Sequence, residues 1–92
     1  MKILVTGSAG FIGSNIVIRL LATESPVEVV GMDSLNDYYD VNLKEYRLKQ
    51  IEKCAANHSE NRYTFIKGNI ADKSLVDSLF ERYRFDIVVN LA

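Results

Sequence analysis

The sequence lacks the features that mark several common classes of protein. It has one cysteine, Cys54, which excludes an internal disulfide. No apolar run approaches the roughly 18 residues of a membrane span, and Lys and Arg are interspersed with acids instead of forming a basic block. Met1 to Val5 is too short for the apolar core of a signal peptide. We therefore expect a cytoplasmic protein that binds neither membranes nor nucleic acid.

Metal binding is equally unsupported. The only histidine, His58, lies in a polar segment at 57–61 with no partner acid or second ligand signalled nearby. Cys54 is interpreted as a small apolar helix residue. With 92 residues, 48% of them apolar, and a formal net charge of −1, the composition is that of one soluble globular unit.

Three glycines near the N-terminus, Gly7, Gly10 and Gly13, follow the apolar run 3–5 and precede a helix-like apolar pattern over 16–21. In such a strand–turn–helix unit, the first glycine permits a sharp turn and the second permits close approach of a pyrophosphate. The third permits close packing of helix on strand. The free N–H groups of the helix then face the phosphates. This context predicts a dinucleotide phosphate site.

Two other structures could account for the glycines. A tight strand-to-helix turn with no ligand is found in many α/β proteins. A P-loop is disfavoured, because no Lys-Ser or Lys-Thr pair follows the glycines.

Asp33 ends a second β-rich run, Val27 to Met32, and lies 20 residues beyond Gly13. A carboxylate at that distance can accept hydrogen bonds from the adenosine ribose. It would repel a 2′-phosphate, and no Lys or Arg follows it before Lys44. NAD is therefore expected rather than NADP, the alternative being that Asp33 is an ordinary turn residue.

The remaining chain continues the alternation of strands and helices. Asp40 is a candidate N-cap for a helix from Val41 to about Ala56, with an apolar stripe among charges, Lys44 included, that are expected in solvent. A third strand at 63–67 follows. Asp72 can cap a third helix, and a last strand begins at Phe85 or Asp86 and ends at Leu91. The expected stripe of the second helix is Leu43, Tyr46, Leu48, Ile51 and Ala55.

The order βαβαβαβ predicts the α/β class: a Rossmann-like parallel sheet with strand order 3-2-1-4, the first part of a doubly wound domain. Residues 1–92 would then form the N-terminal part of one such domain, with no second domain. Two helices would cover one face of the sheet and the third helix the other, with the last strand at an open edge. The face covered by a single helix and the open edge would leave apolar surface exposed. This suggests either a larger domain or self-association through that face and edge.

The segments 3–13 (ILVTGSAGFIG), 29–33 (VVGMD) and 86–92 (DIVVNLA) resemble those of the extended short-chain dehydrogenase/reductases, the NAD-dependent epimerases and dehydratases of nucleotide sugars. Within that family, Leu35 to Asp40 (LNDYYD) is most similar to the UDP-glucuronate 4-epimerases, with dehydratases and reductases as alternatives. The resemblance implies that NAD and a UDP-sugar are bound by the complete enzyme. It covers essentially the whole chain.

The resemblance also implies a set of cofactor-binding residues. The pyrophosphate would lie on the glycine turn, and the adenosine ribose would lie beside the end of the second strand. The adenine would lie near Asn69, where the family more often has Asp. Leu91 and Ala92 would begin a loop that runs past the cofactor. The implied residues are Gly7, Gly10, Phe11, Ile12, Gly13, Asp33, Ser34, Asn36, Asn69, Ile70, Leu91 and Ala92.

In such enzymes the catalytic Ser or Thr and the Tyr-x-x-x-Lys pair would lie beyond the fourth strand, so no catalytic residue is assigned here and this chain alone is expected to be inactive. Tyr63 and Lys67 match the pair by spacing. We reject them, because on a strand these residues would be roughly 13 Å apart, whereas the pair works on one face of a helix. A non-catalytic dinucleotide-binding module remains the alternative.

Overall fold

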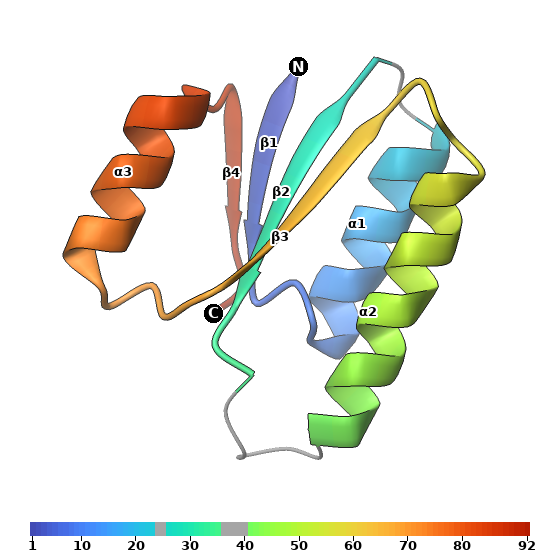
Figure 1. Cartoon of the computed structure of the whole chain (residues 1–92), viewed down its shortest axis with the longest axis horizontal. Coiled ribbons are helices and arrows are strands. Elements are labelled where there is room, and N and C mark those ends of the chain that lie inside the picture. The colour runs from blue at the N-terminus through green and yellow to red at the C-terminus, as the bar shows by residue number, and fades with distance from the viewer. Residues whose placement is uncertain (24–25, 36–40) are drawn as a thin grey trace.

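The computed structural model describes residues 1–23, 26–35 and 41–92, in which strands and helices alternate (Figure 1). The strands pair in parallel in the order β3-β2-β1-β4. The predicted α/β class and strand order are therefore confirmed. No helix in these ranges is long and apolar enough to cross a membrane. The elements are β1 (Lys2–Thr6), α1 (Phe11–Thr23), β2 (Glu28–Asp33), α2 (Val41–Ala56), β3 (Arg62–Lys67), α3 (Lys73–Tyr83) and β4 (Ile87–Asn90).

The two faces of the sheet carry separate cores, as the alternating side chains of parallel strands require. Helices α1 and α2 cover one face and α3 covers the other (Figure 1). On β1, Ile3 and Val5 join the core under α1 and α2, whereas Leu4 joins the core under α3. The core under α1 and α2 comprises Ile3, Val5, Val17, Leu21, Val27, Val29 and Ile51, and the core under α3 comprises Leu4, Val30, Met32, Leu79 and Tyr83.

Strand β4 lies at the edge of the sheet and is shorter than predicted. Its pairing with β1 runs from Ile87 to Asn90. Before it, the Asp86 carboxylate accepts a hydrogen bond from the Lys2 N–H at 2.7 Å. Ile87 and Val88 are 43% and 45% exposed, which is the open apolar edge that the topology predicted.

Helix α2 packs differently from the prediction at its beginning. Ile51 is buried and Leu48 and Ala55 pack against the same core, but Leu43 and Tyr46 are exposed, and Lys44, expected in solvent, is buried. Figure 1 shows why: the first turns of α2 extend past the ends of the strands, where there is no sheet to pack against. The candidate cap Asp40 lies outside the described residues.

Helix α3 has the predicted cap. The Asp72 side chain accepts from the Leu75 N–H at 3.2 Å. At the other end Arg84 adopts a left-handed conformation, φ 51°, and its N–H bonds to Phe80 O. The Phe85 ring then stacks on Tyr83, with centroids 5.5 Å apart, which closes the core under α3.

Asn61, just before β3, joins two elements through its buried amide. Its Oδ1 accepts from the Val27 N–H at 2.9 Å, and its Nδ2 donates to Leu21 O at 2.9 Å. One side chain therefore satisfies a backbone donor before β2 and a backbone acceptor in the last turns of α1. Buried groups of this kind are costly when left without partners.

We predict that Asn61→Ala lowers the free energy of unfolding by about 2 to 4 kcal/mol, because two buried backbone groups each lose a partner. Urea denaturation followed by circular dichroism measures the loss. Asn57→Ala makes the same chemical change at an exposed position and should cost less than about 0.5 kcal/mol. Equal midpoints for the two variants would contradict this role of Asn61.

Candidate functional site

The strands all end at one edge of the sheet, and a cavity of about 830 Å³ lies there. Its size is in the range of small-molecule sites. The structure brings together at this cavity every described residue that the sequence implicated: Gly7, Gly10, Phe11, Ile12, Gly13, Asp33, Ser34, Asn69, Ile70, Leu91 and Ala92. Asn36 lies outside the described residues.

The glycine turn has the geometry that its spacing predicted. Gly7 has a φ of +70°, which side-chain-bearing residues rarely adopt. A Cβ on Gly13 would overlap Gly7 O, so the close contact between the start of α1 and the turn requires glycine. A Cβ on Gly10 would meet only Gly7 O, at 3.2 Å. The backbone at Gly10 is therefore open to the cavity.

The start of α1 presents backbone donors to the cavity. The first helical bond runs from the Ser14 N–H to Gly10 O at 2.9 Å. The N–H groups of Phe11, Ile12 and Gly13 belong to the first turn, which has no intrahelical acceptors, and these residues line the cavity. This is the arrangement that binds phosphate at a helix N-terminus.

Asp33, at the end of β2, is 5% exposed and uses both carboxylate oxygens. Its Oδ2 accepts from the Ala9 N–H in the glycine turn at 3.0 Å. Its Oδ1 accepts from the Leu35 N–H at 2.8 Å and from Lys44 Nζ at 2.9 Å. One carboxylate thus links the glycine turn, the segment after β2 and helix α2.

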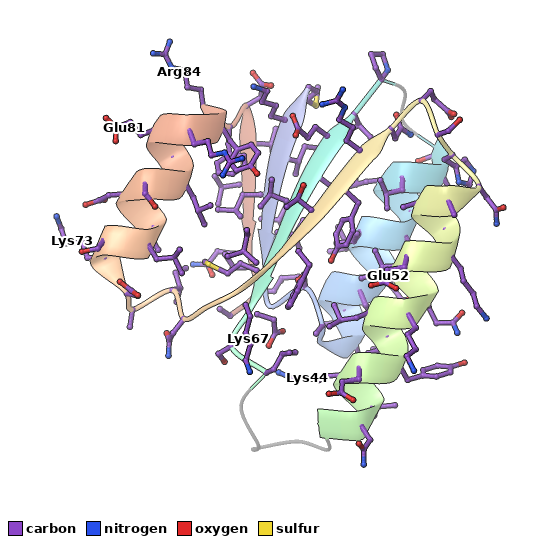
Figure 2. All side chains as sticks on the ribbon, viewed as in Figure 1. Lys44, Glu52, Lys67, Lys73, Glu81 and Arg84 are labelled. Carbon is purple, nitrogen blue, oxygen red and sulfur yellow. The ribbon has the colours of Figure 1, made fainter. Side chains whose placement is uncertain are left out.

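Lys44 and Arg47 are charged residues of the cavity wall that the sequence analysis did not assign to the site. Figure 2 shows Lys44 extending from α2 toward the carboxyl edge of the sheet, where its ammonium pairs with Asp33. One turn further, Arg47 donates to Ala9 O at 3.4 Å and lies over the Phe11 ring. Both cations line the cavity. The prediction that the second helix exposes Lys44 to solvent is therefore wrong.

Leu35 carries strain beside the cavity. Its φ of 54° lies in the left-handed region, which costs a residue other than glycine roughly 1 kcal/mol or more. The backbone N–H of Leu35 donates a hydrogen bond to the Asp33 carboxylate. The hydrogen bonds of Asp33 therefore hold a conformation that leucine alone would not favour.

Polar side chains hold the chain end against the glycine turn. Thr6 Oγ1 donates to Asn90 Oδ1 at 2.7 Å and accepts from the Leu91 N–H at 3.1 Å. A Cβ on Gly7 would lie 2.7 Å from Leu91 O, so the turn and the chain end are in direct contact. Asn90 therefore links the end of β4 to the end of β1.

Asn69 turns the chain after β3. Its Oδ1 accepts from the Ala71 N–H at 2.8 Å, which closes a local turn. Ile70, 40% exposed, lines the cavity next to it. The Asn69 amide is therefore held at the cavity wall.

Tyr63 and Lys67 lie on strand β3, so they do not form a helical Tyr-x-x-x-Lys pair. Burial raises the pKa of the Tyr63 hydroxyl well above its usual value, and the nearby charges of Glu52 and Asp33 raise it further. A hydroxyl that stays protonated at neutral pH is no catalytic base. The structure supports the rejection of this pair.

Cys54 and His58, one turn apart at the end of α2, interact with each other and with the backbone. The Cys54 Sγ lies 3.5 Å from Ile18 O, and burial raises the pKa of its thiol. His58 Nδ1 lies 2.8 Å from Cys54 O and closes the helix end. Both residues have structural partners. Within 1–23, 26–35 and 41–92 no cluster of three His, Cys, Asp or Glu could hold a metal ion.

The strand order and the cavity at the carboxyl edge together define an α/β unit of the doubly wound, Rossmann-like type. Over residues 4–92 the chain matches the family described as GDP-mannose 4,6 dehydratase. The chain belongs to this family, which confirms the predicted membership of the NAD-dependent epimerases and dehydratases.

The similar proteins include both epimerases and dehydratases. Protein CapI of Staphylococcus aureus is 45% identical over 92 residues, 100% of this chain and 25% of that protein. The UDP-glucuronate 4-epimerase of Thermodesulfobacterium geofontis is 40% identical over 89 residues, 97% of this chain and 25% of that enzyme. The dTDP-glucose 4,6-dehydratase of Bacillus anthracis, solved in complex with NAD, has a TM-score of 0.78 and 32% identity, covering 100% of this chain and 26% of that one. The chain spans about a quarter of the length of these proteins.

We predict that Gly13→Ala lowers the free energy of unfolding by about 3 kcal/mol or abolishes folding, because the new methyl group overlaps Gly7 O. Thermal denaturation followed by circular dichroism measures the effect. Gly10→Ala is the matched control: its Cβ meets a single atom at 3.2 Å, and the change should stay within about 1 kcal/mol. A Gly13→Ala variant as stable as Gly10→Ala would show that the helix does not need this contact.

Proposed function

We propose that the chain is the NAD-binding segment of a nucleotide-sugar epimerase. The observation that carries this proposal is the cavity at the carboxyl edge, whose wall combines the open glycine turn, the start of α1 and a buried carboxylate at the end of β2. These three elements together form the dinucleotide-binding pattern of doubly wound α/β folds. The NAD complex of the structurally similar dehydratase supports this choice of cofactor.

The residues of the cavity fit a dinucleotide. The pyrophosphate would lie over Gly10 and the first N–H groups of α1, where there is no side chain to displace it. The adenosine ribose would lie at Asp33, whose Oδ2 has one bond to Ala9 and retains a lone pair for a ribose hydroxyl. The adenine would lie between Ile70 and Asn69. Bound NAD supplies a hydride acceptor, and this chain orients it.

The reaction we favour is inversion of the sugar at C4, as in UDP-glucuronate 4-epimerases. The 40% identity with one such epimerase supports it. Of the segment 35–40, on which the resemblance to these epimerases rests, residues 36–40 lie outside the described residues. A dehydratase or reductase is the second candidate, favoured by the fit to the dTDP-glucose dehydratase. NMR of the products distinguishes these reactions when a complete enzyme that carries this segment is given UDP-glucuronate or dTDP-glucose: an epimerase yields the C4 epimer, and a dehydratase yields a 4-keto-6-deoxy sugar.

We predict that calorimetric titration shows tighter binding of NAD than of NADP, and that Asp33→Ala weakens NAD binding about 10- to 100-fold. The loss of charged hydrogen bonds, each about 1.5 to 3 kcal/mol, sets that range. Asp77→Ala is the control: it removes a carboxylate from the exposed pair with Lys73 on α3, away from the cavity. No binding of NAD by the folded chain would count against the proposed function.

A further inference from the structure

The charges on the cavity wall are unequal. Among the described residues that line the cavity, the charged ones are one acid, Asp33, and two bases, Lys44 and Arg47. The sequence favoured NAD partly because no cation stands near Asp33 along the chain. The structure removes that reason, because α2 brings an ammonium within 2.9 Å of the carboxylate.

Lys44 and Asp33 are nearly enclosed, with 10% and 4% of their side chains exposed. Water therefore screens their attraction little, and each largely cancels the charge of the other. The bond to Asp33 uses one of the three donors of the Lys44 ammonium. Arg47, three residues along the same helix, lies on the same face and reaches Ala9 O in the glycine turn.

We propose that Asp33 selects NAD by neutralising Lys44, and that Lys44, with Arg47 beside it, forms a latent binding site for the 2′-phosphate of NADP. This inference rests on the proposed function. A ribose 2′-hydroxyl donates to the free lone pair of Asp33 and leaves the ion pair intact. A phosphate dianion in its place is repelled by Asp33 and meets an ammonium that is already paired. Without the carboxylate, the same wall offers an ammonium and a guanidinium to the phosphate.

Cofactor preference would then be set by the Asp33–Lys44 pair rather than by Asp33 alone. Two substitutions separate these cases. Asp33→Asn keeps the shape of the side chain and removes its charge, which frees Lys44. Lys44→Met keeps much of the aliphatic stem and removes the cation. In the double variant neither charge remains.

The test is calorimetric titration of NAD, NADP and 2′,5′-ADP into the wild-type chain, both single variants and the double variant, with circular dichroism to show that each is folded. We expect Asp33→Asn to raise the ratio of NADP affinity to NAD affinity at least tenfold and to bind 2′,5′-ADP. Adding Lys44→Met to this variant should lower the ratio of NADP affinity to NAD affinity again by about tenfold. These factors correspond to one charge-assisted hydrogen bond.

Lys67→Met in the Asp33→Asn background is the matched control. Lys67 is the register partner of Asp33 on β3 and is exposed, but it does not line the cavity. Its loss should leave the gain in NADP affinity unchanged within about threefold. If Lys67→Met cancels the gain as strongly as Lys44→Met, a general local charge is responsible and the proposal is wrong.

Lys44→Met in the otherwise wild-type chain provides a second test if Asp33→Asn does not fold. It should weaken NADP binding more than NAD binding, and an unchanged ratio overturns the proposal. Failure of the proposed function has a different signature. If the wild-type chain binds no NAD but Asp33→Asn binds 2′,5′-ADP through Lys44, the proposed function falls and the latent phosphate site stands. If NAD binds and Asp33→Asn gains nothing for NADP, only the present inference falls.

Discussion

The arrangement of the cavity depends on one carboxylate that must be satisfied away from water. Asp33 ends β2 at a point where three segments meet, and a buried charge there is tolerated only if its oxygens are bonded or paired. The donors come from the glycine turn, from the strained backbone at Leu35 and from Lys44 on α2. Each of these segments is positioned by supplying its donor. The site is therefore preorganised by the same bonds that make the carboxylate tolerable.

Local patterns in the sequence were sufficient to predict most of the fold. Apolar runs of strand length, separated by helical periodicity, predicted the alternation of elements, and the right-handed crossovers of parallel strands limited the possible strand orders. The glycine spacing and Asp33 located the cavity, because parallel strands bring their carboxyl ends to one edge. These features depend on residues that are close together in the sequence, which is why they could be predicted from it.

The burial of Lys44 could not be predicted from such local patterns. A lysine among charged residues on a helix has the pattern of a solvated face, and its partner is 11 residues earlier at the end of a strand. Only the overhang of α2 beyond the sheet brings the two together. The same overhang explains why Leu43 and Tyr46, which continue the apolar periodicity, are exposed. Periodicity identifies the face of a helix, but it does not show where the surface that covers this face ends.

A single acidic residue at the end of the second strand is commonly treated as sufficient to choose between NAD and NADP. The geometry here indicates a different balance, because the electrostatic field at the ribose is the sum of Asp33 and the cations that α2 carries to it. Without a cation beside it, the carboxylate would be a buried, uncompensated charge, and it would also repel the two phosphates of the dinucleotide. Pairing with Lys44 makes the carboxylate stable and lowers that repulsion, while the remaining lone pair of Oδ2 still recognises a hydroxyl. Lys44 therefore allows Asp33 to be buried. Asp33 in turn must keep the charge of Lys44 neutralised if the site is to prefer a hydroxyl to a phosphate.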